Sequence, residues 1–182
     1  MNIAVIDTET NWADEVMSIG TVIADADTFA PIEAKYHVLP IPRQIGGMYE
    51  STLFIPSPVE PVLCTRAEAL GQLKDWFRQH QVTAIFAYNA NFDRNHLPEL
   101  RSFQWYDIMR LAAYRQYNPK IPKTAECFST GRMKRGYGVE PMLRILSGKR
   151  AYSETHNAIH DAFDELEIMQ LLGHKFQDYI PL

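Results

Sequence analysis

Two carboxylates at the end of the first apolar run are the first residues whose spacing suggests chemistry. Asp7 and Glu9 follow the run at residues 3–6, which is typical of a β-strand. Alternate residues of an extended chain point to one face, so the two side chains face the same way. Sheets of α/β proteins bind ligands at the carboxyl ends of their strands, where such a pair can hold a divalent cation. The pattern also arises by chance in acidic chains, and a solvated strand end explains it equally well.

Two further motifs add groups suited to the same chemistry. Asp93 follows a predicted fourth strand and approaches Asp7 if the first and fourth strands are neighbours. Asp161 lies at the start of the last long helix, and His156 precedes it by five residues, about 140° around an ideal helix. We therefore place His156 in the preceding loop, from which it can reach a water beside a metal held by Asp161. Both residues also have ordinary structural explanations. Asp93 can be an acidic residue in the first turn of a helix, and His156 can be a capping or surface residue.

Four carboxylates and a histidine are the parts needed to hydrolyse a phosphodiester. The reaction needs a hydroxide at neutral pH and a stabilised leaving oxygen, which two divalent ions about 3.5–4 Å apart supply. Oxygen ligands select Mg²⁺ or Mn²⁺, and four carboxylates suffice for two ions once phosphate oxygens join. A histidine can accept the proton of the water without binding metal. His160-Asp161 is also the HD dipeptide of another class of metal phosphohydrolases, but that class needs further helical histidines and this chain has six in all.

The elements that must position these residues form one domain spanning residues 1–182, of which 46% are hydrophobic and 22% charged. Strands are predicted at 3–6, 16–24 and 35–39, as antiparallel neighbours, and at 83–87. A long proline-rich loop is expected at 40–61. Helices are predicted from Thr65 through 77, at 91–97, from Asp107 through 114, at 139–146 and at 157–172. This order indicates an α/β domain with a mixed central sheet flanked by helices.

Composition narrows the setting in which the protein works. No run of about 18 apolar residues is present, and the amino terminus lacks the pattern of a signal peptide. Cys64 and Cys127 are far apart and suit a reducing compartment, as small buried hydrophobic residues. We therefore expect a cytoplasmic protein without membrane contact.

Positive charge is concentrated in one segment, although the whole chain has a formal net charge of -4. Residues 101–150 hold 11 of the 18 Lys and Arg residues and 3 of the 22 Asp and Glu residues. Within this segment Arg132, Lys134 and Arg135 lie beside Tyr137. Such a basic and aromatic cluster either contacts a phosphate backbone or remains a solvated surface.

Together, the three motifs resemble those of the DnaQ-like exonucleases with four acidic residues and a histidine, the DEDDh family. The matching segments are DTET at 7–10, NANFD at 89–93 and HNAIHDA at 156–162. The resemblance covers essentially the whole chain and implies a ribonuclease H-like fold. It also implies removal of nucleotides from the 3′ end of single-stranded DNA or RNA, with release of nucleoside 5′-monophosphates.

The resemblance assigns roles to individual residues. It makes Asp7, Glu9, Asp93 and Asp161 ligands of two Mg²⁺ or Mn²⁺ ions, and His156 the general base. Substrate contacts are carried over to Thr8, to Asn89, which orients Asp93 or bonds the sugar, and to Phe92, as a base-stacking ring or a core residue. Asp107 matches a position that is often acidic in the family and is expected to cap its helix.

The chain departs from the family in the segment that wedges against the terminal base. Relatives often have a histidine there, whereas residues 42–53 contain Gly46-Gly47-Met48-Tyr49. Met48 and Tyr49 either form the wedge or belong to a turn packed on the core.

Two other functions remain open at this point. One is hydrolysis of short oligonucleotides or nucleotide-like molecules, because the chain carries no added nucleic-acid-binding domain. The other is a non-catalytic nucleic-acid-binding subunit, for example one docked on a polymerase. The sequence leaves open DNA against RNA, a homodimer or polymerase partner, and the pathway, DNA repair among them.

Overall fold

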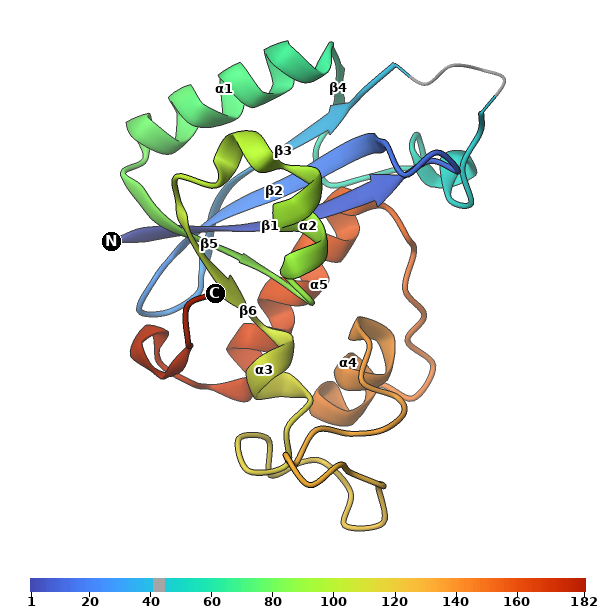
Figure 1. Ribbon diagram of the computed structural model, residues 1–182, viewed down its shortest axis with the longest axis vertical. Helices are drawn as coiled ribbons and strands as arrows, with labels where there is room; N and C mark the ends of the chain where they lie inside the picture. The colour runs from blue at the N-terminus through green and yellow to red at the C-terminus, as the bar shows by residue number, and fades with distance from the viewer. Residues whose placement is uncertain (41–44) are drawn as a thin grey trace.

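The computed structural model describes residues 1–40 and 45–182, so residues 42–44 of the expected terminal-base segment lie outside the described residues. Within the described residues, six strands form one mixed sheet in the order β4-β3-β2-β1-β5-β6 (Figure 1). The strands are β1 Asn2–Thr10, β2 Val16–Asp25, β3 Pro31–Val38, β4 Pro61–Leu63, β5 Val82–Ala87 and β6 Gln104–Asp107. β1, β2 and β3 pair antiparallel, as expected. β5 pairs parallel to β1, which confirms that the first strand and the strand before Asp93 are neighbours.

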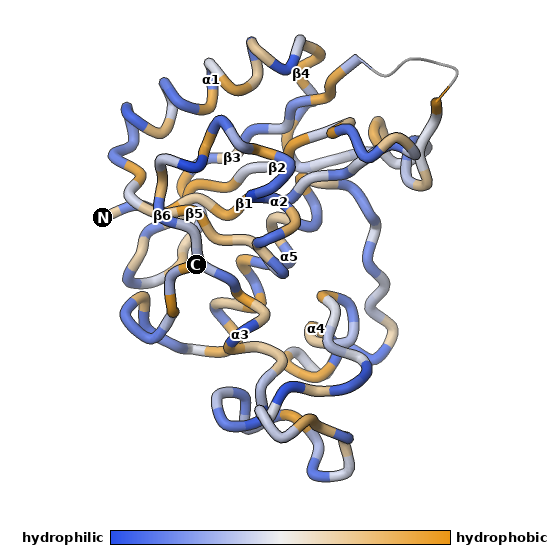
Figure 2. Tube along the Cα trace, viewed as in Figure 1, coloured by the Kyte–Doolittle hydropathy of each residue, from blue (hydrophilic) through white to orange (hydrophobic). Residues whose placement is uncertain are grey.

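Helices cover both faces of the sheet (Figure 1). They are α1 Arg66–Gln79, α2 Asn91–His96, α3 Met109–Ala112, α4 Val139–Ser147 and α5 Ala158–Leu172, with 3₁₀ turns η1 Glu50–Thr52, η2 Pro98–Leu100 and η3 Phe176–Asp178. One core packs α1 against alternate residues of β1 and β2, such as Ile6 and Ile19. The other packs α4 and α5 against the opposite face, with Ile3 and Val5. In Figure 2, hydrophobic and hydrophilic stretches alternate along α1, as in a helix with one buried face.

Several helix ends follow the sequence signals closely. Thr65 and Glu68 form the predicted capping box at the start of α1. α4 and α5 end at Gly148 and Gly173, whose φ angles of 75° and 68° lie in the left-handed region that glycine adopts without strain.

Other boundaries differ from the prediction. β1 continues to Thr10, so Asp7 and Glu9 lie within the strand and not after it. β4 and β6 are additional strands of three and four residues. Strands this short give no clear alternating pattern, and pairing with β3 and β5 defines them. The helix expected from Asp107 is reduced to α3, which spans Met109–Ala112.

The composition-based expectations have mixed outcomes. Cys64 and Cys127 are free, but both are partly exposed, because each lies at the margin of a core. Among the described residues, no helix is long and apolar enough to cross a membrane.

A close backbone contact sets the position of α5 on the sheet. A Cβ atom on Gly20 of β2 would lie 2.0 Å from the backbone oxygen of Ala158, the first residue of α5. The start of α5 therefore rests directly on β2, and a larger residue at position 20 must displace it.

We expect Gly20→Ala to lower the melting temperature, because the added methyl group collides with backbone and not with a flexible side chain. Gly71→Ala in α1 is the matched control: nothing lies within 4 Å of its added Cβ, and alanine favours a helix by about 0.8–1 kcal/mol over glycine. Thermal unfolding followed by circular dichroism measures both variants. An unchanged melting temperature for Gly20→Ala would contradict the close packing.

Candidate active site

Asp7 and Glu9 lie where β1 extends beyond its parallel neighbour. The pairing of β1 with β5 ends at Val5 and Phe86, whereas the pairing with β2 continues through Glu9. Among the described residues, no strand therefore pairs with this side of the carboxyl-terminal half of β1. The chain that leaves β5 turns there into α2, whose first turn carries the buried Asp93. This register brings the first two motifs together.

The third motif approaches the same region from α5. Asp161 lies in the first turn of α5 and is buried. His156 precedes the helix with a left-handed φ of 52°, which confirms its predicted place in the loop. Asn157 fixes this loop, because its amide donates to the Tyr36 hydroxyl at 3.1 Å and to the Thr52 carbonyl oxygen at 2.7 Å.

Three of the predicted residues form a group that can hold a metal ion. Ligand atoms of Glu9, His156 and Asp161 all lie within 4.8 Å of one another. Asp93 accepts a hydrogen bond from the Thr8 hydroxyl at 2.7 Å. Within the described residues, one buried oxygen of Asp7 and one of Asp161 have no hydrogen-bond partner. Buried oxygens without partners are costly, and a divalent cation would satisfy them. The donor set thus fits hard, oxygen-bound metal ions.

Burial and mutual repulsion raise the pKa values of these carboxyl groups. Burial, followed by the charges of Asp93 and Glu165, holds the pKa of Asp7 well above its usual range. Burial is also the largest cause that raises the pKa of Glu9 to about 7, that of Asp93 to about 7 and that of Asp161 to about 9. Carboxyl groups so placed gain strongly from a nearby cation, which favours their ionised forms.

The imidazole of His156 has the opposite shift. Burial lowers the pKa of His156 below its usual value. The side chain is therefore neutral at pH 7 and able to accept a proton.

Glu165 is a buried carboxylate that sequence reasoning missed. It lies one turn after Asp161 on α5 and is 1% exposed, and one of its oxygens has no hydrogen-bond partner within the described residues. Burial, followed by the charge of Asp93, holds the pKa of Glu165 well above its usual range. The spacing of four residues from Asp161 was a usable signal, because it puts both carboxylates on one helix face.

The predicted substrate residues divide into two groups: Thr8 and Phe92 line a pocket that also includes Glu9, whereas Asn89 and the three basic residues do not line it. Phe92 is 39% exposed, and Thr8 and Phe92 line a pocket of about 250 Å³ together with Glu9, Thr10, Asn11, Trp12, Met48 and Tyr49. Phe92 is therefore a pocket residue and not a core residue. Trp12, which is 65% exposed at this pocket, was missed because a lone tryptophan in a turn has no distinctive pattern.

Asn89 lies in the turn after β5, and the first of its two expected roles, orienting Asp93, is taken by another side chain. Thr8, and not Asn89, is the side chain that bonds Asp93. Asn89 has a left-handed φ of 60°, and its backbone amide donates to Asp107 at 3.0 Å. Asp107, the last residue of β6, also accepts from the amide of Met109, the first residue of α3, at 3.0 Å. The N-cap position of α3 is Ile108 and not the expected Asp107, but Asp107 ties the turn after β5 to the start of this helix.

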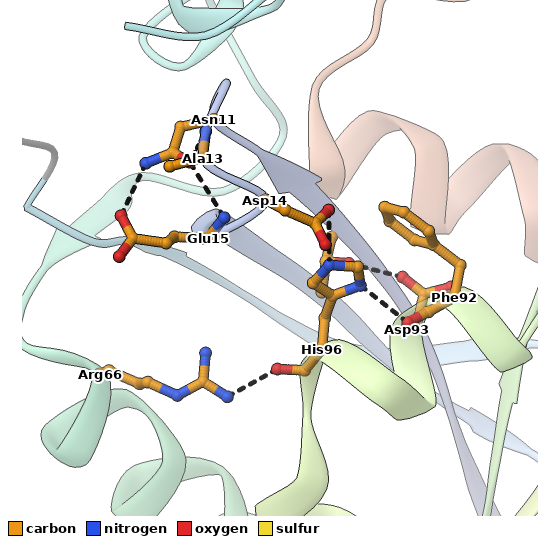
Figure 3. A network of polar contacts seen from close by, with 9 residues as sticks. Asn11, Ala13, Asp14, Glu15, Arg66, Phe92, Asp93 and His96 are labelled. Carbon is orange, nitrogen blue, oxygen red and sulfur yellow. Dashed lines mark hydrogen bonds and ion pairs between the residues drawn. The ribbon is translucent and has the colours of Figure 1, made fainter. Parts of the chain in front are cut away.

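A polar network holds the turn between β1 and β2 against α2 (Figure 3). Asn11 accepts hydrogen bonds from the backbone amides of Ala13 and Glu15, both at 2.9 Å. His96 at the end of α2 contacts Asp14 at 3.0 Å, and Arg66 donates to the His96 carbonyl oxygen at 2.6 Å. The network keeps the turn that carries Trp12 close to the helix that carries Phe92 and Asp93.

The predicted basic cluster lies on a projecting loop before α4. Arg132 lies over the rings of Phe128 and Tyr137, at 5.1 Å and 5.3 Å from their centroids. Lys134 and Arg135 are exposed. The Tyr88 hydroxyl, just after β5, donates to the Tyr137 carbonyl oxygen, which fixes this loop beside the strand that leads to Asp93.

The raised pKa values make the stability of the metal-free protein depend on pH. Glu9 and Asp93 titrate at about 7 and Asp161 at about 9 when folded, but near 4 when unfolded. Between these values the folded state binds more protons, so the free energy of unfolding falls as pH rises. We expect the melting temperature in chelator to drop from pH 6 to pH 8, and Mg²⁺ to restore it at pH 8. A rise with pH in chelator would contradict this electrostatic arrangement.

Comparison with known proteins identifies the fold. A scan against protein-family models gives no match, and a search of curated proteins gives none. Solved structures match over nearly the whole chain. A 3′-exonuclease in a structure of 3′-end-specific recognition of a histone mRNA stem-loop is 13% identical, with a TM-score of 0.64 over 100% of this chain and 70% of that one.

Two further structures agree. The nuclease domain of 3′hExo, a DEDDh family member bound to rAMP, is 14% identical, with a TM-score of 0.64 over 97% of this chain and 92% of that one. Exonuclease X in complex with 5′ overhanging duplex DNA is 19% identical, with a TM-score of 0.54 over 96% and 95%. The chain therefore has the ribonuclease H-like fold of the DEDDh 3′-exonucleases, as its three motifs predicted.

Proposed function

We propose that the protein is a metal-dependent 3′ to 5′ exonuclease that hydrolyses single-stranded DNA or RNA from the 3′ end to nucleoside 5′-monophosphates. One observation carries the proposal: the ligand atoms of Glu9, His156 and Asp161 lie within 4.8 Å of one another. The charges of Asp93 and Asp161 also raise the pKa of the half-buried Asp7 beside them. Buried carboxylates that repel one another are costly for folding, and strongly raised pKa values of this kind concentrate at functional sites.

The four carboxylates Asp7, Glu9, Asp93 and Asp161 would hold two Mg²⁺ or Mn²⁺ ions. Such ions, when bound, lower the pKa of a water molecule and stabilise charge on the leaving 3′ oxygen. His156, neutral at pH 7, accepts the proton of the attacking water. Thr8 holds Asp93 in place through its hydroxyl.

The pocket beside these residues is suited to the terminal nucleotide. Phe92, Trp12 and Met48 offer exposed apolar surface to a base, and aromatic rings stack every base without reading its sequence. Asn89 remains the candidate for the sugar.

The pocket also fits a nucleotide without a long strand attached, which keeps hydrolysis of short oligonucleotides as the second candidate. Its volume of about 250 Å³ is small. The basic loop with Arg132, Lys134 and Arg135 favours a polymer, since a mononucleotide needs no extended phosphate contact. Cleavage rates on a dinucleotide and on a strand of about 20 nucleotides distinguish the two functions, because an enzyme for short oligonucleotides cleaves the dinucleotide faster.

We expect Asp161→Asn to abolish turnover and His156→Ala to lower it by about 10² to 10⁴-fold, with metal affinity retained in the histidine variant. The assay is digestion of 5′-labelled single-stranded DNA and RNA in Mg²⁺, Mn²⁺ or chelator. Asp75→Asn on α1, an exposed acid, is the matched control. The wild type should produce a ladder that shortens from the 3′ end. Equal activity of Asp161→Asn and the control would overturn the proposal, and lost metal affinity in His156→Ala would make the histidine a ligand.

Neutralising Arg132, Lys134 and Arg135 with glutamine should weaken binding of a long strand and reduce its salt dependence. Each phosphate contact to a single strand contributes about 0.7 to the slope of log affinity against log salt. Fluorescence anisotropy of a labelled strand at several salt concentrations, in Ca²⁺ to prevent cleavage, measures this slope. A triple glutamine variant at Lys74, Arg78 and Arg101 removes the same charge elsewhere. Equal slopes in the two triple variants would leave the loop cluster as solvated surface.

A further inference from the structure

The segment 46–53 connects the two sides of the site. At its start, the Gly46 carbonyl oxygen accepts a hydrogen bond from the Trp12 amide at 3.1 Å. Gly47 packs so closely that an added Cβ would lie 2.5 Å from the sulfur of Met17 on β2. The first residues of the segment are thus fixed to the turn that carries Trp12.

The end of the same segment holds the backbone around His156. The Thr52 hydroxyl contacts the carbonyl oxygens of both Tyr49 and His156, and the Thr52 carbonyl oxygen accepts from Asn157 at 2.7 Å. The Tyr36 hydroxyl donates to the Leu53 carbonyl oxygen at 2.9 Å. A non-glycine residue with a positive φ, such as His156, keeps this conformation when its surroundings enforce it.

Tyr49 lies between these two ends of the segment, and its ring contacts both sides of the site. The ring stacks on the imidazole of His156 with a centroid distance of 4.0 Å and an interplanar angle of 17°. Tyr49 also lines the pocket together with Met48, Trp12 and Phe92. The same side chain therefore contacts the imidazole and borders the space in which a base would lie.

We propose that Tyr49 is a positioning residue that couples a nucleobase in the pocket to the orientation of His156. The inference rests on the proposed function and adds a requirement to it: the 3′-terminal nucleotide must carry a base for full turnover. A base against Tyr49 fixes the ring, and the ring fixes the plane of the imidazole beside Glu9 and Asp161. Tyr49 contributes through its ring plane, so its hydroxyl group is dispensable for this role.

The first test observes the stack without any cleavage. A stacked aromatic ring shifts the imidazole proton signals of His156 upfield in NMR spectra, and His156→Gln assigns those signals. We expect the shift in the wild type and in Tyr49→Phe, and its loss in Tyr49→Leu. Phe54→Leu, which removes an exposed aromatic ring just beyond the segment, is the control and should retain the shift. Identical His156 signals in Tyr49→Leu and the wild type would overturn the stack.

The second test measures turnover. Misplacement of a catalytic group by about 1 Å can cost about 10²-fold in rate, so Tyr49→Leu should lower kcat by about 10 to 10²-fold, with Tyr49→Phe and Phe54→Leu within about twofold of the wild type. Metal affinity, measured with Mn²⁺ alone by electron paramagnetic resonance, should be the same in all four proteins. A normal kcat in a folded Tyr49→Leu variant would overturn the inference.

The third test uses strands that end in an abasic nucleotide. In the wild type, loss of the terminal base should lower kcat as well as raise KM, whereas in Tyr49→Leu it should raise KM alone. An abasic effect on kcat that is equal in both proteins would overturn the coupling. A wild type that cleaves no strand would instead overturn the proposed function, and the NMR signals then decide the stack by themselves.

Discussion

Repulsion among buried carboxylates is the constraint on which the rest of the structure depends. The charges of Asp93, Asp161 and Glu165 all raise the pKa of Asp7, and those of Asp93 and Asp161 also raise the pKa of Glu165. Without a cation or protons this arrangement is unfavourable. Two apolar cores, one on each face of the sheet, offset the repulsion and keep the carboxylates together.

The carboxylates come from separate segments of the chain, and the register of strand pairing brings them together. β1 extends beyond β5, which leaves room for α2 to insert Asp93 beside it. α5 approaches from the opposite face and rests on Gly20, so Asp161 enters the same region. Three segments separated by more than 60 residues thus meet where the central strand loses one neighbour.

The sequence predicted those residues of the candidate site that belong to short motifs. Asp7, Glu9, Asp93, Asp161 and His156 belong to types and spacings that are unusual at strand and helix ends, and the structure brings them into one region. Helix caps at Thr65, Gly148 and Gly173 were predictable because capping is local.

Long-range contacts could not be predicted in the same way. The stack of Tyr49 on His156 joins residues that are far apart along the chain. The same holds for the bond of Thr8 to Asp93, which takes one of the two roles expected for Asn89. β4 and β6 are too short for a periodic signal, so their pairing partners define them. These features depend on tertiary placement, which single-sequence patterns do not contain.

The contact of Gly20 with Ala158 belongs to one of two differently built halves of the candidate site. Asp7 and Glu9 lie on the central sheet, and Asp161 lies on a helix whose first residue packs directly against Gly20. The opposite half is built from the turn at Trp12 and the segment 46–53, where the side chains of Trp12 and Met48 are exposed on loops. Substitutions in these loops alter the lining of the pocket and leave the sheet and helix that carry the carboxylates untouched. The shape and polarity of the pocket can therefore change without any change in the elements that hold the carboxylate cluster.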